Sequence, residues 1–363
     1  MRRLLLLMVV CVSSTVGANT IQSRVISDQL NRPWSVAFLP NNHFLVTERG
    51  GTLRIVDQSG RVSTPIKGLP KIAAVGQGGL LDVILHPDFK YNNVIYLSYV
   101  AGSAVRGYST EVLRATLDQQ AGRLNNVNTI FIASPKTKGG RHFGSRLLFD
   151  NNGYLYISLG DRGVDSQSQD LTNHHGSIIR LHDNGDVPQD NPWANKKALA
   201  AGIKPEIFSY GHRNIQGLAL HPSTGQVWAH EHGPQGGDEL NHIVAGKNYG
   251  WPIITYGVNY GTGTKIGEGT KKQGLEQPEY YWDPSIAPSG LAYYNNAWFI
   301  GALKFQLLAK LTSIDGKWAE ERFLERKFGR IRDVKVGLDS NNKPRLYLLT
   351  DAKKGRLIQL SLN

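Results

Sequence analysis

The sequence predicts an all-β fold, a six-bladed β-propeller in which each blade is a four-stranded antiparallel sheet. Glycine accounts for 40 of the 363 residues, and no long amphipathic helix stands out. A strand–turn–strand unit recurs six times along the chain. Because one such unit cannot bury both of its faces, stacking the units around an axis is the arrangement that protects most strand edges. A β-sandwich and a β-helix are the alternatives.

Each unit consists of an apolar strand, a turn rich in Asn, Asp, Pro or Gly, and a second strand of alternating pattern. In chain order the units are "SVAFLPNNHFLVTER" (35–49), "LLDVILHPDFKYNNVIYLSYV" (80–100), "SRLLFDNNGYLYISLG" (145–160), "QGLALHPSTGQVWAHE" (216–231), "SGLAYYNNAWFIGAL" (289–303) and "RDVKVGLDSNNKPRLYLLTD" (332–351). The segments "IQSRVISDQL" (21–30) and "GRLIQLSL" (355–362) also have strand character. We expect these two segments to share one blade and close the ring.

The spacing of the units is unequal. Long insertions, including residues 161–210 and 230–289, separate the third, fourth and fifth units. Long loops between the blades of a propeller gather on one face and carry its function. We therefore expect the functional site in these insertions, around the central axis.

Residues 1–18 follow the pattern of a secretory signal peptide, with Arg2 and Arg3 before a short apolar core and small residues up to Ala18. The apolar run is shorter than the roughly 20 residues of a membrane span. Lipidation at Cys11 is the alternative. We expect a periplasmic or secreted protein without a membrane span, in which residues 19–363 form a single propeller domain.

Cys11 is the only cysteine, so a chain cleaved after Ala18 has no disulfide, thiolate metal site or cysteine nucleophile. The formal net charge is +12, but the basic residues are dispersed, as in the pair Lys271–Lys272. This pattern is typical of solvated lysines rather than a nucleic-acid surface, and it is compatible with a small anionic ligand. We expect no nucleic-acid partner, and a monomer or homodimer.

One histidine and one aspartate are placed at the same end of a predicted hairpin. In "RHFGSRLLFDNNGYLYISLGDRG", His142 opens the first strand and Asp161 follows the second, with the turn near the middle. An aspartate there can accept the distant ring N–H of the histidine, fix its tautomer and raise its basicity. A purely structural hydrogen bond would have the same spacing, so the pattern alone leaves both interpretations open. The glycines around His142 are expected to keep side chains clear of an approaching ligand.

Cationic and amide side chains occur at the entrances of other predicted strands. Arg213 and Asn214 precede one strand, and Arg330 and Arg332 alternate onto one side of an extended segment. Together with Lys304 they would form an anion-binding surface if they converge. Taken singly, each is as compatible with a solvated side chain.

The segment "HEHGPQGGDELNHI" offers two kinds of metal ligand. His230 and His232 have a spacing that some transition-metal sites use, although ordinary strand-end residues look the same. The turn that follows suits a hard cation better, because carbonyl oxygens are free there and Asp238 and Glu239 add carboxylates. A polar turn without a metal is the alternative.

Seven motifs that occur in order resemble a known family: "GQGGLLDV", "GSRLLFDNNGYLYISLGDRG", "SYGHRNIQGLALHP", "HGPQGGDELN", "KNYGWP", "SIAPSG" and "GRIRDV". By these motifs, which cover nearly the whole chain after residue 18, the sequence is similar to the soluble aldose sugar dehydrogenases that use pyrroloquinoline quinone (PQQ). These six-bladed propellers are related to soluble quinoprotein glucose dehydrogenase.

The resemblance implies a role for each matching position. His142 would be the general base for the sugar C1 hydroxyl, Asp161 the carboxylate that orients it, and Gln77 a residue of the substrate and cofactor site. The residues that would hold the carboxylates and carbonyls of PQQ are Arg213, Asn214, Lys304, Arg330 and Arg332. Main-chain carbonyls of Gly233 and Pro234 would bind the calcium ion of the cofactor, and Glu239 and Tyr249 lie at positions around a second, structural calcium. Tyr280 is similar to a substrate-side aromatic residue.

The function implied is oxidation of aldose mono- and oligosaccharides at C1 to lactones, with electrons passed from PQQ to an external acceptor. Calcium would act as a Lewis acid on the quinone oxygen. The segment before "SIAPSG" lacks the cysteine-containing stretch of the glucose enzyme, so a broad range of aldoses is expected rather than glucose alone. A non-catalytic propeller that binds a sugar or protein, and a metal-dependent lactonase, are the competing hypotheses.

Overall fold

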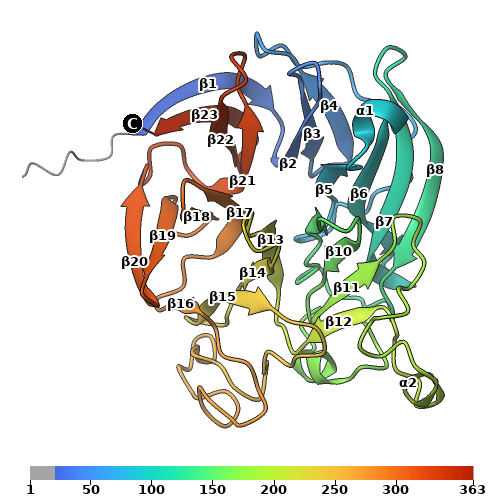
Figure 1. The fold of residues 1–363 in the computed structure, drawn as a ribbon, viewed down its shortest axis with the longest axis vertical. Coiled ribbons are helices and arrows are strands. Elements are labelled where there is room, and N and C mark those ends of the chain that lie inside the picture. The colour runs from blue at the N-terminus through green and yellow to red at the C-terminus, as the bar shows by residue number, and fades with distance from the viewer. Residues whose placement is uncertain (1–20, 363) are drawn as a thin grey trace, which may run out of the picture.

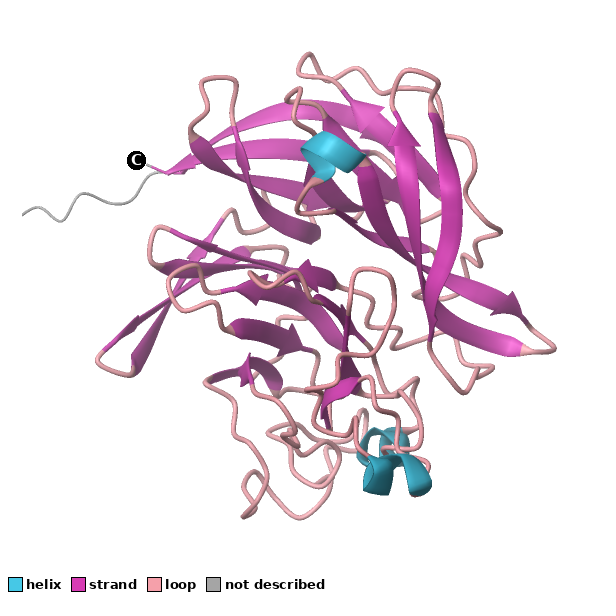
Figure 2. Cartoon of the chain, turned by 45° about the vertical axis from the view of Figure 1, so that its right-hand side comes forward, coloured by secondary structure: helices cyan, strands magenta, loops and turns pink. Residues whose placement is uncertain are grey.

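Six antiparallel sheets surround a central axis, and helix is confined to short segments (Figures 1 and 2). The structure, a computed structural model, describes residues 21–362, so the expected signal peptide lies outside the described residues. The helical segments are α1 (Phe89–Asn92), α2 (Lys196–Ala200) and a 3-10 helix (Asp165–Gln169). The predicted six-bladed propeller is confirmed.

Each of the six repeated units forms the two innermost strands of one blade. From the axis outward, the blades are β2 (Pro33–Phe38), β3 (Phe44–Glu48) and β4 (Thr52–Val56); β5 (Leu80–Leu85), β6 (Val94–Ser103), β7 (Gly107–Asp118) and β8 (Arg123–Ile132); β9 (Leu147–Phe149), β10 (Leu155–Ser158), β11 (Ser177–Leu181) and β12 (Ile207–Tyr210); β13 (Ile215–Leu220), β14 (Val227–Glu231), β15 (Asp238–Ile243) and β16 (Tyr280–Trp282); β17 (Pro288–Tyr294), β18 (Ala297–Ala302), β19 (Leu308–Ile314) and β20 (Lys317–Phe323); and β21 (Ile331–Leu338), β22 (Pro344–Thr350), β23 (Gly355–Leu362) and β1 (Ile21–Leu30).

The ring closes through the sixth blade, where β1 pairs antiparallel with β23 from Ile21 opposite Leu362 to Leu30 opposite Gly355. Figure 1 shows the blue and red strands side by side at this point. The two ends of the described chain therefore complete one sheet, as expected from their strand patterns.

The first blade departs from the four-stranded pattern because only three of its strands are regular. The segment after β4 still runs along it, since the backbone N–H groups of Ser63 and Ile66 donate to carbonyls of β4, and Val62 forms an isolated bridge with Val56. Pro65 lies between these contacts and has no N–H to donate. The fourth strand of this blade is thus reduced to irregular pairing.

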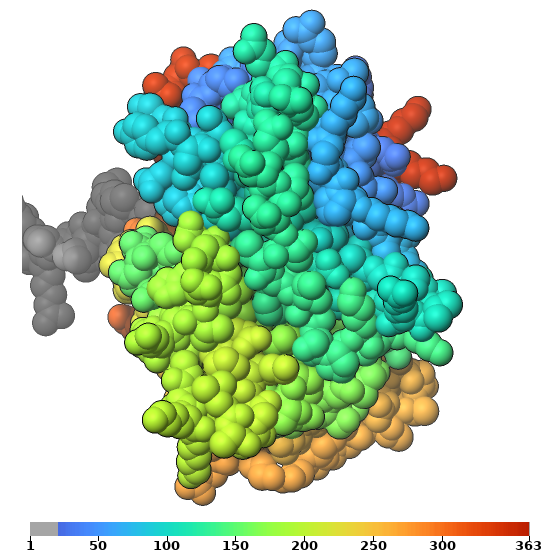
Figure 3. Space-filling model, turned by 90° about the vertical axis from the view of Figure 1, so that its right-hand side faces the viewer, coloured from blue at the N-terminus to red at the C-terminus, as the bar shows by residue number. Residues whose placement is uncertain are grey.

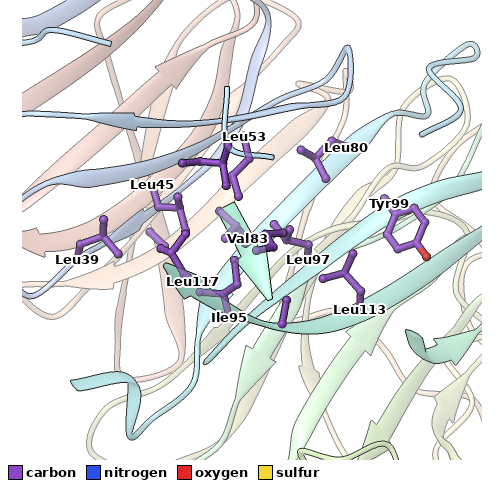
Figure 4. Close-up of a cluster of buried hydrophobic side chains, with 14 of the residues drawn as sticks. Leu39, Leu45, Leu53, Leu80, Val83, Ile95, Leu97, Tyr99, Leu113 and Leu117 are labelled. Carbon is purple, nitrogen blue, oxygen red and sulfur yellow. The ribbon is translucent and has the colours of Figure 1, made fainter. Parts of the chain in front are cut away.

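Hydrophobic clusters fill the spaces between adjacent blades all the way around the ring. Between the first two blades, for example, Leu45 and Leu53 face Leu97 and Leu113 across the gap (Figure 4). Both faces of most blades are covered in this way, which explains why the inner strands are apolar on both sides.

A single buried arginine, Arg146, occupies the axis. Its guanidinium lies within 2.8 Å of Asp333 and 3.4 Å of Asp82, and 4.2 Å from the ring of Trp34. It also donates to the backbone carbonyls of three further strand residues, Gln216, Ser289 and Arg332. Since Arg146 directly precedes β9 and its partners lie on β2, β5, β13, β17 and β21, this one side chain connects the innermost strands of all six blades.

The two long insertions extend from the third and fourth blades. The segment between β15 and β16 forms the loops at the lower edge of Figure 1, and Figure 3 shows it in orange along the lower edge of the molecule. Within residues 21–362, none of the helices has the length and apolar character to cross a bilayer.

Candidate active site

The predicted site residues line two adjoining cavities at the entrance end of the inner strands. The first, here called the cationic cavity, has a volume of about 470 Å³. Its wall includes the residue one to three positions ahead of the innermost strand of every blade: Arg32, Gln77, Gly144, Asn214, Ala287 and Arg330. The remaining lining residues include Trp34, Arg49, Gln216, His232, Lys304, Arg332 and Asp351.

The second cavity, here called the histidine cavity, has a volume of about 480 Å³ and shares Gln77 and His232 with the first. Both insertions contribute to it, through the lining residues Asp161, Gly163, Asp165, Pro234, Trp251, Asn259, Tyr260 and Ile266. His142, Arg141 and Arg213 complete its wall. The two insertions and the axis therefore meet at one place, as the unequal repeat spacing predicts.

His142 and Asp161 are in direct contact. The Nδ1 atom of His142 lies 2.6 Å from Oδ1 of Asp161, which also accepts the backbone N–H of Gly163 at 2.7 Å. The other carboxylate oxygen accepts the indole N–H of Trp251 at 2.9 Å. A carboxylate that accepts these bonds is an acceptor only, so Nδ1 carries the proton and Nε2 is the nitrogen left to accept one.

Burial lowers the pKa of His142 below its ordinary value, although the hydrogen bond to Asp161 offsets part of this effect. Burial acts to raise the pKa of Asp161, but its hydrogen bond with His142 holds the pKa below the ordinary value. The pair is therefore a neutral imidazole beside an ionised carboxylate at neutral pH. This is the protonation state that a general base requires.

The local backbone explains how the pair is held. His142 itself has a left-handed φ of 54°, and its backbone N–H donates to the side-chain oxygen of Gln77 at 2.7 Å. At Gly160, directly before Asp161, a Cβ atom would lie 2.3 Å from the carbonyl oxygen of His142. At Gly144, φ is +61° and a Cβ atom would lie 2.5 Å from Cα of Leu159. Gly144 is thus needed for close packing of two backbones, and it also lines the cationic cavity, where the absence of a side chain leaves room for a ligand as expected from the sequence.

The expected cofactor-binding residues converge on the cationic cavity. Asn214, Lys304, Arg330 and Arg332 all line it, whereas Arg213 lines the histidine cavity beside it. Arg330 and Arg332 both form ion pairs with Asp351, at 3.4 Å and 2.7 Å. Asn214 uses its side-chain oxygen to accept the backbone N–H of Gly144 at 3.2 Å, which leaves its amide N–H groups for a ligand.

The carbonyls expected to bind calcium accept hydrogen bonds from side chains in this structure. The carbonyl oxygen of Gly233 accepts from Arg213 at 2.6 Å, and that of Pro234 accepts from the hydroxyl of Tyr260 at 2.9 Å. Neither oxygen accepts a backbone N–H among the described residues. A cation bound there would displace the guanidinium of Arg213 from Gly233.

A third, much smaller cavity of about 10 Å³, here called the glutamate cavity, lies behind Arg213 and includes Glu231, Glu239 and Tyr249 in its wall. Glu231 and Glu239 are opposite each other on β14 and β15. Burial and the neighbouring charge of Glu231 raise the pKa of Glu239 well above its ordinary value. Two adjacent carboxylates, one buried (Glu231) and one half-buried (Glu239), suit a hard cation, although the Tyr249 hydroxyl is already bonded to the carbonyl of His242.

For His230 and His232 the structure favours the strand-end interpretation, and Tyr280 lines neither of the two large cavities. His230 and His232 each place Nε2 near a backbone carbonyl, Gly290 and Pro288, as strand-end residues do. Tyr280 lies in the core between the fourth and fifth blades, where its hydroxyl donates to Glu320. The tyrosine at the histidine cavity is Tyr260, which is 67% exposed.

Several site residues have no counterpart in the sequence predictions: Arg32, Trp34, Arg49, Trp251 and Asp351. One signal could have found Arg32, because it directly precedes β2 just as Arg213 and Asn214 precede β13. Trp251 reaches Asp161 across 90 residues of sequence, and no local pattern marks that contact.

Comparisons with known proteins identify the family. A family model described as Glucose / Sorbosone dehydrogenase matches residues 30–359. The chain is 42% identical over 366 residues to the protein named Aldose sugar dehydrogenase YliI of Escherichia coli (strain K12), covering 97% of this chain and 96% of that protein. The apo crystal structure of the soluble aldose sugar dehydrogenase from Escherichia coli superposes with a TM-score of 0.89 at 41% identity, over 95% of this chain and 100% of that one. The PQQ-bound form of an aldose sugar dehydrogenase from Streptomyces coelicolor superposes with a TM-score of 0.80 at 28% identity, over 95% and 99% of the two chains. The chain belongs to the glucose/sorbosone dehydrogenase family.

Proposed function

We propose that the protein is a PQQ- and calcium-dependent dehydrogenase that oxidises aldose sugars at C1 to lactones. The observation that carries this proposal is the juxtaposition of the neutral His142–Asp161 pair with a cavity lined by five basic side chains, the two cavities sharing Gln77 and His232. A base beside an anion-binding cavity is what oxidation of an alcohol by an anionic redox cofactor requires.

The donor set fits PQQ. Its three carboxylates match the basic side chains of the cationic cavity, and Asn214 adds a neutral amide donor. When bound, PQQ would supply an electron-poor quinone carbon as hydride acceptor, and calcium, which the Gly233 and Pro234 carbonyls would hold, would make that carbon more electrophilic. The PQQ-bound structure of the Streptomyces coelicolor relative supports the PQQ assignment.

The side chains of this protein would handle the proton and the sugar. His142 accepts the proton of the C1 hydroxyl at Nε2, while Asp161 stabilises the imidazolium that forms. Loss of a hydride from C1 and a proton from its oxygen converts the hemiacetal to the lactone, and two electrons pass to the cofactor. The exposed ring of Tyr260, with the polar groups of Asn259 and Arg141, gives the histidine cavity the mixed wall that a sugar ring requires.

The proposed cellular location, oligomeric state and use of an external acceptor rest on the sequence. We place the protein in the periplasm or outside the cell, as a monomer or homodimer that passes electrons to an external acceptor. The N-terminal pattern of residues 1–18 supports this location. Broad selectivity among aldoses, including oligosaccharides, is compatible with the open, 67% exposed Tyr260.

The proposal is tested with purified protein loaded with PQQ and calcium, by following reduction of an artificial dye with a panel of aldoses. We expect sugar-dependent dye reduction that requires both PQQ and calcium. Absence of dye reduction with every sugar, in protein shown to have bound PQQ, would exclude the dehydrogenase and favour a propeller that only binds.

A further inference from the structure

The basic side chains of the cationic cavity are not equivalent, because only some of them have a counter-charge. Arg330 and Arg332 both contact the same carboxylate, that of Asp351. Burial acts to raise the pKa of Asp351, but the Arg332 charge holds it below the ordinary value, so the carboxylate is ionised. The two arginines that the sequence motifs identify therefore share a neutralising charge before any ligand binds.

Arg32 and Arg49 differ, since neither has an ion-pair partner among residues 21–362. The one side-chain hydrogen bond of Arg49 runs from Nη1 to the carbonyl of Gly76 at 2.8 Å, which leaves most of its N–H groups free. Lys304, which lies 5.1 Å from the ring of Phe305, is also without a carboxylate partner in the described part of the chain. All three line the cationic cavity.

The backbone fixes both arginines at the wall where the first blade meets the last. The backbone N–H of Arg32 donates to the carbonyl of Ala352 at 2.8 Å, directly after Asp351, and the backbone N–H of Arg49 donates to the carbonyl of Arg32 at 3.0 Å. The two side chains thus enter the cavity from anchored positions at the ring closure. Their placement does not depend on a mobile loop of their own.

We propose that Arg32 and Arg49 are carboxylate-binding residues of the cofactor site, which provide, with Lys304, most of the positive charge that Asp351 does not neutralise. The inference rests on the proposed function and extends it to residues outside the family motifs. The five basic groups of the cavity minus one carboxylate leave a net charge of +4, enough for a ligand with three carboxylates. Without Arg32 and Arg49 the remainder is +2, so these two residues supply half of the net positive charge of the cavity.

The test measures binding rather than turnover. PQQ is titrated into apoprotein with calcium but without sugar or dye, and quenching of tryptophan fluorescence is followed at low and high salt. We expect Arg32→Gln and Arg49→Gln each to weaken binding on the order of tenfold, because each removes a charged hydrogen-bond donor. Both variants should also show a smaller loss of affinity on adding salt. Arg106→Gln, which removes an exposed arginine that lines neither cavity, is the matched control and should bind like the unmodified protein.

A second variant keeps the test informative if the first two are poorly folded. Asp351→Asn removes the competing carboxylate and should bind PQQ several-fold more tightly, a gain that a damaged fold cannot produce. Unchanged affinity in Arg32→Gln and Arg49→Gln, with turnover intact, would overturn the inference and leave the proposed function standing. Failure of the proposed function alone is recognised with pyridine-2,4,6-tricarboxylate as a redox-inactive probe of the anion site. If that probe binds with the predicted dependence on Arg32 and Arg49 while no sugar oxidation occurs, the anion site stands and the proposed function fails.

Discussion

Replacing Arg146 by methionine should destabilise the whole ring, because this side chain is the common partner of the innermost strands of all six blades. The substitution keeps a similar side-chain volume but leaves Asp82 and Asp333, both fully buried, without a cation, and three backbone carbonyls lose their donor. Breaking a buried ion pair from one side typically costs about 3–5 kcal/mol in the free energy of unfolding. Unfolding entropy of about 2.1 cal/mol/K per residue amounts to roughly 0.7 kcal/mol/K for this chain, so the melting temperature should fall by about 4–7 °C.

The assay is thermal unfolding of the apoprotein, followed by circular dichroism at a fixed heating rate. Arg61→Met is the control, since Arg61 pairs with Asp57 on the surface with 84% of its side chain exposed, and exposed pairs contribute little. The triple variant Arg146→Met, Asp82→Asn, Asp333→Asn should recover much of the loss by removing the uncompensated charges. A melting temperature of Arg146→Met within about 1 °C of the Arg61→Met value would refute this account of the axis.

Three further predictions concern the site. His142→Ala should retain PQQ binding and lose roughly 10²–10⁴-fold in turnover, measured by dye reduction, because this is the usual contribution of a general base. Normal turnover in this variant would remove His142 from the mechanism. The acid limb of the pH–rate profile should have its midpoint below about 6.5, because burial lowers the pKa of His142. In Asp161→Asn the midpoint should move to still lower pH, because Asp161 raises the pKa of His142. A midpoint that stays in place in this variant would contradict the pairing of the two residues. Calcium at about 100 times its dissociation constant should stabilise the protein by about 2.7 kcal/mol, which raises the melting temperature by roughly 4 °C. Glu239→Gln should lose the part of this increase that comes from the glutamate cavity. An identical increase in the variant would place the ion elsewhere.

The blades were predictable because their signals are local. In each unit the apolar strand, the turn and the second strand lie within about 20 residues, so pattern alone identifies the hairpin that faces the axis. The His142–Asp161 contact belongs to the same class, since both residues flank one such hairpin. The repeat pattern did not show that the fourth strand of the first blade loses its regular pairing, which happens in the segment that contains Pro65.

The rest of the site depends on contacts between distant segments. Trp251 donates to Asp161, and Arg32 and Arg49 line the same cavity as Arg330 and Arg332 across the ring closure, without any spacing that marks them. Arg146 shows the limit most clearly, because it reads in the sequence as one more polar residue after "HFGS". Only the circular arrangement of six blades brings two carboxylates and three carbonyls to its guanidinium.

The most direct test of the account is a single turnover in the absence of oxygen and of any electron acceptor. Protein loaded with PQQ and calcium is mixed with a stoichiometric amount of an aldose, and the absorption of the bound cofactor is followed by stopped flow. We expect complete reduction of one PQQ per active site, with one lactone formed, and a rate at least about a hundredfold lower in His142→Gln at equal cofactor occupancy. Equal rates of reduction in both proteins, or no reduction in the unmodified protein, would contradict this expectation.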